Sequence, residues 1–286
     1  MSKSRPPGKL RRRALTALVL LPLVVAATTF LPSAWLAVFL GVFVVVAAWE
    51  WTILAGLNDI RWQVLYLLVL VGLEVLAIWV AWDDAEAALV LTTLALLWWV
   101  WAFIDLQRHG SKASGLFSSR LGKLVTGGLV LLPVWFAAVY LHHADPMKPA
   151  ALLFAFSLVW LADTSAYFAG RQWGKTQLAP AVSPGKTIEG LIGALAAVTL
   201  LAYICGTMIW HLHGFKLVIW LFVALGTALF SVVGDLVESK LKRLSGAKDS
   251  GSWLPGHGGV LDRIDAVTAA VPVFACGWIM LVKGDA

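Results

Sequence analysis

Nine long apolar stretches fill most of this 286-residue chain. A helix that crosses the hydrocarbon core of a bilayer needs roughly 20 mostly apolar residues, and each stretch is about that long. Charged residues make up only 13% of the sequence, whereas they make up about 25% of ordinary soluble domains. The sequence therefore predicts an all-α polytopic membrane protein in which residues 1–286 form a single integral membrane domain. The predicted spans are residues 14–31, 34–55, 62–82, 87–106, 124–142, 149–170, 187–209, 216–234 and 265–282.

The distribution of basic residues predicts how these spans are oriented. The N-terminal segment "MSKSRPPGKLRRR" is basic, but no small-residue cleavage site ends the apolar run after it, so we interpret that run as a retained helix. With a cytoplasmic N-terminus and alternating spans, only three of the 22 Lys and Arg residues lie outside: Lys148, Lys216 and Lys283. Because cytoplasmic loops are enriched in Lys and Arg, we expect this orientation, with a periplasmic C-terminus.

Several other kinds of site find little support in the sequence. The net charge of +6 comes from basic residues that flank the spans, so nucleic acid is not an expected partner. Cys205 and Cys276 both lie within apolar stretches, which argues against a disulfide or a thiolate metal site. The histidines at 142–143 and in 211–213 lie at predicted outer helix ends, and we interpret them as interfacial side chains and not as metal ligands.

Polar side chains share one helical face at the end of the eighth span. The segment "GDLVESKLKR" places Asp235, Glu238, Ser239 and Lys242 at positions i, i+3, i+4 and i+7. A stripe of acid, hydroxyl and base is costly to place in lipid, which indicates a functional site. The alternative for these residues alone is a salt-bridged helix end whose long side chains reach the interface.

A charged, glycine-rich loop then leads to the ninth span. In "KDSGSWLPGHGGVLDRID", glycines around His257 let the backbone approach a ligand and present N–H groups to phosphate oxygens. A plain glycine-rich turn would explain the glycines alone. Carboxylates that hold Mg²⁺ beside cations that hold phosphates indicate phosphoryl or nucleotidyl transfer. The charged residues that suggest it are Lys240, Lys242, Arg243, Lys248, Asp262, Arg263 and Asp265.

A further polar group lies at the end of the sixth span. Asp163 and Tyr167 are four residues apart and share a helical face, and an Asp inside a span is a functional candidate. The loop after this span reads "SPGKTIEG", in which Lys186 is suited to contact a phosphate or a lipid headgroup. Glu50 and Glu74 also lie inside predicted spans, and the sequence shows no partner for either.

The stretch from residue 235 to 265 contains four short motifs in a fixed order. They are Ser239-x-Leu241-Lys242-Arg243, Lys248-Asp249, Pro255-Gly256-His257-Gly258-Gly259 and Asp262-Arg263-x-Asp265. This pattern resembles the signature of phosphatidate cytidylyltransferases, also called CDP-diacylglycerol synthases. The segments "AYFAGRQWGK", "SPGKTIEG" and "AAWEW" are also similar to bacterial members of that family.

The resemblance implies a reaction, a metal and a set of site residues. The family converts CTP and phosphatidate into CDP-diacylglycerol and pyrophosphate for phospholipid biosynthesis, so we expect a bacterial inner-membrane enzyme whose site faces the cytoplasm. It implies Mg²⁺ held by Asp235 and Asp262, and it leaves open a second, monovalent cation and a homodimer. The implied catalytic residues are Asp235, Lys248, Asp249 and Asp262. The implied substrate-binding residues are Ser239, Lys242, Arg243, His257, Gly258, Gly259, Arg263, Asp265, Asp163, Tyr167, Ser183, Lys186 and Thr187.

Two other functions compete with this expectation. A CTP-dependent polyprenol or lipid kinase would share the broad chemistry, but the intact signature from Lys248 to Asp265 argues against it. A secondary transporter for an anionic solute could use Asp163 and Asp235 within the membrane. A transporter would line both entrances with polar groups and often contains internal repeats, whereas here the polar groups gather on one side and no convincing repeat is present.

Overall fold

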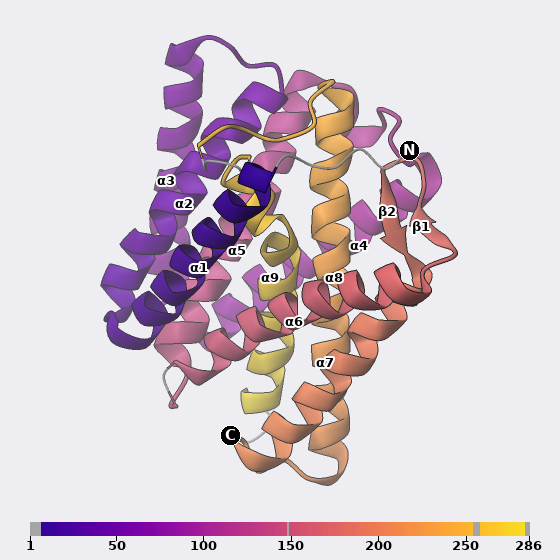
Figure 1. Cartoon of the computed structure of the whole chain (residues 1–286). Coiled ribbons are helices and arrows are strands. Elements are labelled where there is room, and N and C mark those ends of the chain that lie inside the picture. Colours follow the sequence, from indigo (N-terminus) through magenta and orange to yellow (C-terminus); the bar gives the residue numbers. More distant parts are fainter. Residues whose placement is uncertain (1–6, 148, 254–257, 284–286) are drawn as a thin grey trace.

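The computed structural model describes residues 7–147, 149–253 and 258–283. Over these ranges the chain forms a bundle of long helices with one two-stranded hairpin (Figure 1). The prediction of an all-α polytopic membrane protein is confirmed, because eight of the described helices are long and apolar enough to cross a membrane. A shorter apolar segment, Leu18–Phe30, completes the predicted set. The helices are α1 (Pro7–Phe30), α2 (Ser33–Leu54), α3 (Ile60–Ala81), α4 (Ala85–His109), α5 (Arg120–Ala144), α6 (Ala150–Trp173), α7 (Ile188–Met208), α8 (Gly214–Leu244) and α9 (Leu261–Lys283), with a short 3-10 turn η1 (Gly115–Ser118).

Short polar side chains between the apolar stretches set where several helices begin. Asp59 accepts a hydrogen bond from the Arg61 amide at the start of α3, and Asp84 accepts from the first turn of α4. Ser119 and Thr187 do the same for α5 and α7. Each side chain satisfies a backbone N–H that has no partner within its helix. The apolar stretches therefore become separate helices whose ends match the predicted spans closely, except at the start of α1 and the end of α8.

Helix α8 continues well beyond the predicted eighth span. It contains 31 residues, and its last turns are the charged segment after Gly234. At a rise of 1.5 Å per residue it is about 46 Å long, whereas the hydrocarbon core of a bilayer is about 30 Å thick. The helix can therefore carry the polar stripe from Asp235 to Lys242 as a rigid extension of an apolar span.

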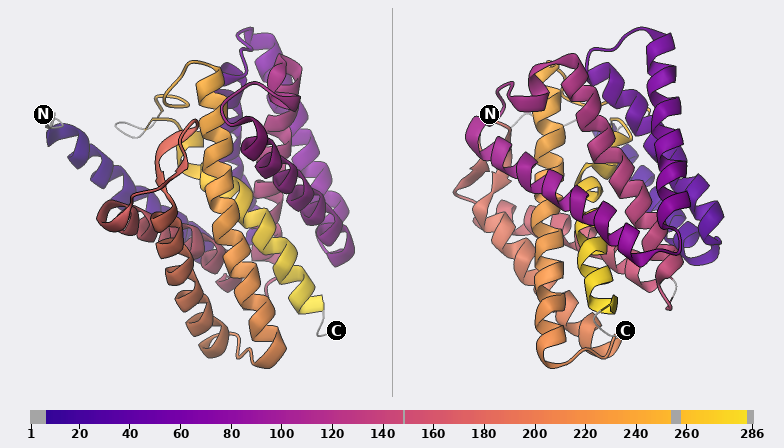
Figure 2. Two further views of the ribbon diagram at one scale, coloured as in Figure 1. Left: turned by 90° about the vertical axis from the view of Figure 1, so that its right-hand side faces the viewer. Right: turned by 180° about the vertical axis from the view of Figure 1, so that it is seen from behind.

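The last two helices run side by side through the bundle, as all three views show (Figures 1 and 2). The two helices approach each other closely at Gly234, where a Cβ atom would overlap the backbone carbonyl of Asp265 and crowd the side chain of Ala269. Only glycine fits such close backbone contact. Because Asp235 follows Gly234, this contact brings the acidic ends of α8 and α9 together.

A hairpin connects α6 to α7, where the sequence suggested only a loop. Strand β1 (Gln177–Ala179) pairs antiparallel with β2 (Ser183–Thr187), and Ala179 lies opposite Ser183. Gly190, in the first turn of α7, packs against the backbone of α6 at Ala166 and Gly170. This packing holds the end of β2, including Lys186, against the helices that carry the predicted site.

Candidate active site

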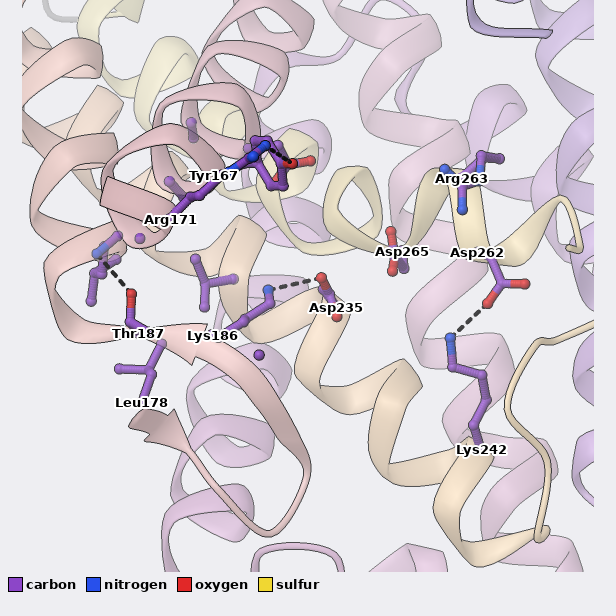
Figure 3. Close-up of a pocket in the computed structure, with 18 of the residues that line it drawn as sticks. Tyr167, Arg171, Leu178, Lys186, Thr187, Asp235, Lys242, Asp262, Arg263 and Asp265 are labelled. Carbon is purple, nitrogen blue, oxygen red and sulfur yellow. Dashed lines mark hydrogen bonds and ion pairs between the residues drawn. The ribbon is translucent and has the colours of Figure 1, made fainter. Parts of the chain in front are cut away.

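A cavity of about 620 Å³ lies between α6, β2, α7, α8 and α9 (Figure 3). Its wall combines residues from three separate parts of the sequence, so the fold gathers groups that the sequence presents far apart. Ten residues predicted for the site line this cavity: Asp163, Tyr167, Lys186, Thr187, Asp235, Lys242, Asp249, Asp262, Arg263 and Asp265.

Asp235 is held by a lysine from the hairpin. The Lys186 ammonium lies 2.8 Å from Asp235 Oδ2, and both side chains are only partly exposed. The Ser239 hydroxyl, one helical turn along α8, donates to Asp235 Oδ1 at 3.3 Å. The predicted helical face of α8 is therefore present, and the end of β2 supplies its counter-charge.

Asp262 has a similar arrangement on the wall of the same cavity. Lys242 Nζ donates to Asp262 Oδ1 at 2.6 Å and also forms an ion pair with Glu238, one turn earlier on α8. Asp262 Oδ2 accepts hydrogen bonds of 2.9 Å from the backbone amides of Ser250 and Gly259. Each predicted metal ligand is thus paired with a lysine predicted to hold a phosphate (Figure 3).

Two further carboxylates line the same cavity. Asp265, one turn into α9, is close enough to Asp235, Lys186 and Lys242 for its charge to interact with theirs. Asp163 on α6 interacts in the same way with Lys186, Asp235 and Arg263. The cavity therefore alternates acidic and basic groups, which is the surface that a metal-bound polyphosphate requires.

The donor set suits a metal that arrives with its substrate. In the part of the chain that the structure describes, no three His, Cys, Asp or Glu side chains gather as a ready metal cage. Mg²⁺ in nucleotide sites needs only one or two protein carboxylates, because phosphate oxygens and water complete its octahedral shell. Asp235 on α8 and Asp262 on α9 are carboxylates of the kind that this mode requires, and both line the cavity.

Glu50 on α2 holds, from outside the cavity, the loop between α8 and α9 (residues 245–260), which we call the signature loop. This carboxylate is completely buried and accepts hydrogen bonds from the Ser250 hydroxyl at 3.0 Å, the Val260 amide at 3.0 Å and the Leu261 amide at 2.8 Å. A Cβ atom on Gly259 would overlap the Glu50 carboxylate, so the loop backbone lies directly against it. Glu50 and Asp262 together fasten both ends of the loop.

Several predicted residues lie away from the cavity wall. Arg243 and Lys248 are exposed. Ser183 sits in the hairpin opposite Ala179, and Ser239 acts on Asp235 instead of lining the wall. Gly259 donates to Asp262, and Gly258 has a φ of 85° and packs on the Asp262 carboxylate. His257 lies outside the described residues.

The expectation that Lys240 belongs to the phosphate-binding cations is wrong. Lys240 is completely buried, donates to Asp105 Oδ2 at 2.5 Å and to the Ser114 hydroxyl at 2.9 Å, and lies 5.0 Å from the centre of the Phe117 ring. On a helix, Lys240 points away from the face shared by Asp235 and Lys242. It joins α8 to α4 and the η1 turn.

Two residues of the site region were missed by sequence reasoning. Arg171 lines the cavity and donates to the Tyr167 hydroxyl at 3.2 Å, and its position four residues after Tyr167 could have indicated this. Glu50 showed a signal as well, because a carboxylate inside an apolar span is a functional candidate. Its partners are about 200 residues away in the sequence, so no local pattern could name them.

Comparison with known proteins decides the family. The model of the cytidylyltransferase family matches residues 11–280. The chain belongs to the cytidylyltransferase family. All cavity-lining residues of this cytidylyltransferase-family chain, from 162 to 265, fall within the matched region.

Two curated relatives match nearly the whole chain, and a third matches about half of it. A phosphatidate cytidylyltransferase of Pseudomonas aeruginosa is 42% identical over 274 residues, which are 94% of this chain and 98% of that protein. A phosphatidate cytidylyltransferase of Haemophilus influenzae is 36% identical over 289 aligned residues, 93% of this chain and 97% of that protein. A phosphatidate cytidylyltransferase of Staphylococcus saprophyticus is 43% identical over 137 residues, 47% of this chain. The family resemblance expected from the motifs is confirmed.

Proposed function

We propose that the protein transfers the cytidylyl group of CTP to phosphatidate, forming CDP-diacylglycerol and pyrophosphate for phospholipid biosynthesis. The observation that best supports this proposal is the pairing of Asp235 with Lys186 and of Asp262 with Lys242 on one cavity wall. Each pair offers one carboxylate for a cation and one ammonium for a phosphate. The full-length similarity to phosphatidate cytidylyltransferases supports the same reaction.

In the proposed reaction a phosphate oxygen of phosphatidate attacks the α-phosphorus of CTP. A new P–O bond forms there, and the bond between the α-phosphorus and the bridging oxygen of the β-phosphate breaks, so that pyrophosphate leaves. The attacking oxygen is already anionic near neutral pH and needs little help from a base. The protein must mainly offset repulsion between anions and stabilise the leaving group. Lys186, Lys242 and Arg263 supply the positive charge for this task.

We propose that Asp235 and Asp262 hold Mg²⁺ together with phosphate oxygens and water. When bound, the ion supplies positive charge to the phosphate oxygens that carry negative charge during transfer. In this scheme Lys186 and Lys242 exchange a carboxylate partner for a phosphate partner, so no buried charge is left uncompensated. Asp249 lines the same cavity and would orient one of these cations. A second, monovalent cation and a homodimer stay predictions.

The proposed location follows from the two substrates. Phosphatidate lies in the membrane and CTP is dissolved in the cytoplasm, so the reaction requires a site where a membrane bundle meets the cytoplasm. We infer that the end of the bundle with the hairpin and the signature loop faces the cytoplasm of a bacterial cell, with the N-terminus on the same side. The 22 basic residues, of which only three fall on the other side, support this orientation.

The decisive experiment measures pyrophosphate release by the purified protein from CTP, with and without phosphatidate. We expect release that depends on phosphatidate and Mg²⁺, with CDP-diacylglycerol identified by mass spectrometry in equal amount. A CTP-dependent lipid kinase would instead release CDP and phosphorylate the lipid. Release of CDP, or no release of either product with phosphatidate, would contradict the proposal.

A further inference from the structure

A second, mainly apolar cavity of about 350 Å³ adjoins the active-site cavity. Its wall is formed by aliphatic and aromatic side chains of α1, α2, α5, α6 and α9. At its outer edge Leu21 of α1 is 47% exposed, so the cavity reaches the surface that would face lipid. We call this second cavity the apolar groove. Its lining gives it affinity for hydrocarbon and little for CTP.

The apolar groove and the active-site cavity share two residues, Asp163 and Arg263. On α6, Asp163, Trp160 and Phe156 are spaced by three and four residues, so they form one stripe that changes from acidic to aromatic. On α9, Arg263 and Val267 are four residues apart and form the facing stripe. Both helices therefore change from polar to apolar in the same direction, away from the active-site cavity.

Arg263 lies where the apolar groove meets the active-site cavity, and its guanidinium N–H groups are free to donate to a ligand. Within the described residues its side chain makes no ion pair or hydrogen bond, although its charge interacts with that of Asp163. A guanidinium carries five N–H donors in a geometry that matches phosphate oxygens. A ligand that places an anionic phosphate at Arg263 can therefore extend hydrocarbon into the groove.

We propose that the apolar groove binds an acyl chain of the phosphatidate substrate, with the lipid phosphate at Arg263. The inference rests on the proposed function and assigns a place to the part of the substrate that does not react. Binding energy from such a non-reacting part can position the attacking oxygen. The shared residues put the lipid phosphate and the lysine–carboxylate pairs on the same side of the junction.

Other apolar hollows on the bundle do not offer the same combination. Two of them, one between α3, α4 and α5 and one mainly between α2 and α3, share no lining residue with the active-site cavity. A third, beside the hairpin, meets it only through Leu178, Leu191 and Val232, so no cation stands at that junction to hold a phosphate. Ordinary bilayer lipid can fill these hollows without reaching the lysines.

The test is a competition between two phosphatidates that differ only in chain length. The purified protein receives CTP and an equimolar mixture of dioctanoyl and dioleoyl phosphatidate in detergent micelles, and mass spectrometry measures the ratio of the two CDP-diacylglycerol products. Val267→Phe narrows the groove one turn from Arg263. We expect it to shift the product ratio toward the short chains roughly tenfold, with an unchanged KM for CTP.

Matched variants keep the result interpretable. Val80→Phe makes the same change in the hollow between α3, α4 and α5, and it should keep the wild-type ratio. Val24→Phe narrows the groove from the side of α1, so it provides a second measurement of the product ratio if Val267→Phe does not fold. If Val267→Phe and Val24→Phe are active and keep the wild-type product ratio, or if Val80→Phe shifts this ratio equally, the inference is overturned. If the wild-type protein made no product from either lipid, the proposed function itself would fail.

Discussion

At the scale of single residues, the signature loop depends on two carboxylates with different tasks. Asp262 faces the cavity through Lys242 and at the same time accepts two loop amides. Glu50 lies behind the loop and does not line the cavity, but it accepts three hydrogen bonds, from Ser250, Val260 and Leu261. Ser250 joins them, since its hydroxyl donates to Glu50 and its amide donates to Asp262. Glu50 is therefore a positioning residue.

Replacing Glu50 should disturb CTP use through the loop. Glu50→Ala leaves three buried donors unpaired, each costing about 1–3 kcal/mol. We expect kcat/KM for CTP to fall roughly tenfold or more, while the KM for phosphatidate changes little. Glu50→Gln keeps one acceptor oxygen and should recover part of the loss. Steady-state kinetics in detergent measures both constants.

The matched control is Glu74→Ala, which removes another buried carboxylate from a membrane-spanning helix. Glu74 does not line the active-site cavity, so its loss should leave the KM for CTP near the wild-type value. A KM for CTP in Glu50→Ala equal to that of the wild type would show that Glu50 only supports packing.

The proposed metal ligands should act as a unit. Asn keeps the shape of Asp and removes its charge, so Asp235→Asn and Asp262→Asn should each lower kcat roughly 100-fold, as loss of one electrostatic stabiliser typically does. The double variant should be scarcely worse than either single variant, because both would have lost the same ion. The Mg²⁺ concentration for half-maximal rate should rise in each single variant. Near-normal turnover of Asp262→Asn at saturating Mg²⁺ would exclude the metal role and leave Asp262 as a loop support.

The sequence predicted much of the site at this scale because helical spacing is local. Asp163 with Tyr167, and Asp235 with Lys242, fall on shared faces that can be read directly, and all four line the cavity. Lys240 shows the limit of such reading. It is two residues from Lys242, but the helix turns it about 200° away, into contact with Asp105, which lies 135 residues earlier. Local charge does not reveal which side of α8 another helix covers.

At the scale of elements, a buried polar network fixes α8 against α4. Asp105 Oδ1 accepts from the Ser114 hydroxyl at 2.8 Å and lies 3.1 Å from His109 Nδ1, while Oδ2 accepts from Lys240. The Asp105 carboxylate and the Ser114 hydroxyl both accept hydrogen bonds from the buried Lys240 ammonium. It sets the rotation of α8 about its axis and so directs the opposite face, with Asp235 and Lys242, toward the cavity.

Breaking one partner of this network should destabilise the protein more than removing both. Lys240→Met leaves a buried carboxylate without its cation, and loss of one partner of a buried ion pair typically costs about 3–5 kcal/mol. Asp105→Asn should have a comparable effect. The double variant should unfold at a higher temperature than either single variant. Circular dichroism during heating in detergent measures the unfolding temperatures of the three variants. Decreases in unfolding temperature that simply add in the double variant would contradict the pairing of Lys240 with Asp105.

The helices themselves were predictable, whereas the hairpin and the length of α8 were not. An apolar stretch in lipid must satisfy every backbone hydrogen bond internally, so length and composition nearly determine a helix. Outside the hydrocarbon region that constraint ends. The segment from Gln177 to Thr187 forms strands by pairing with itself. Helix α8 continues to Leu244 because Lys240 pairs with Asp105 on α4 and Lys242 pairs with Asp262 on α9.

At the scale of the whole molecule, the charged groups of the site gather at one end of the bundle. The signature loop follows the C-terminal end of α8, and the turn before α8 lies at the opposite end of this long helix (Figure 1). The orientation of α8 therefore decides which compartment supplies the nucleotide. The arrangement also disfavours a transporter, which would need comparable polar groups at both entrances.

Two single cysteines at the ends of α8 test the orientation. In a background in which Cys205 and Cys276 are replaced by Ser, we expect Ser245→Cys to react with a membrane-impermeant thiol reagent only after the cytoplasmic side is opened. His213→Cys should react from the periplasm in intact spheroplasts. Both positions are exposed, so access depends on the side of the membrane. Labelling of both from the same side would contradict the nine-span orientation.

The hydrogen bonds from Val260 and Leu261 to Glu50 join residues 210 and 211 positions apart. During synthesis the chain is made and inserted from its N-terminus, so the second helix enters the membrane long before its partners exist. The Glu50 carboxylate therefore cannot form these hydrogen bonds until α9 has been inserted beside α2. The candidate active site is therefore completed only when α9 has been inserted, and a nascent chain that stops before α9 contains most of the helices but lacks the α9 residues of the site.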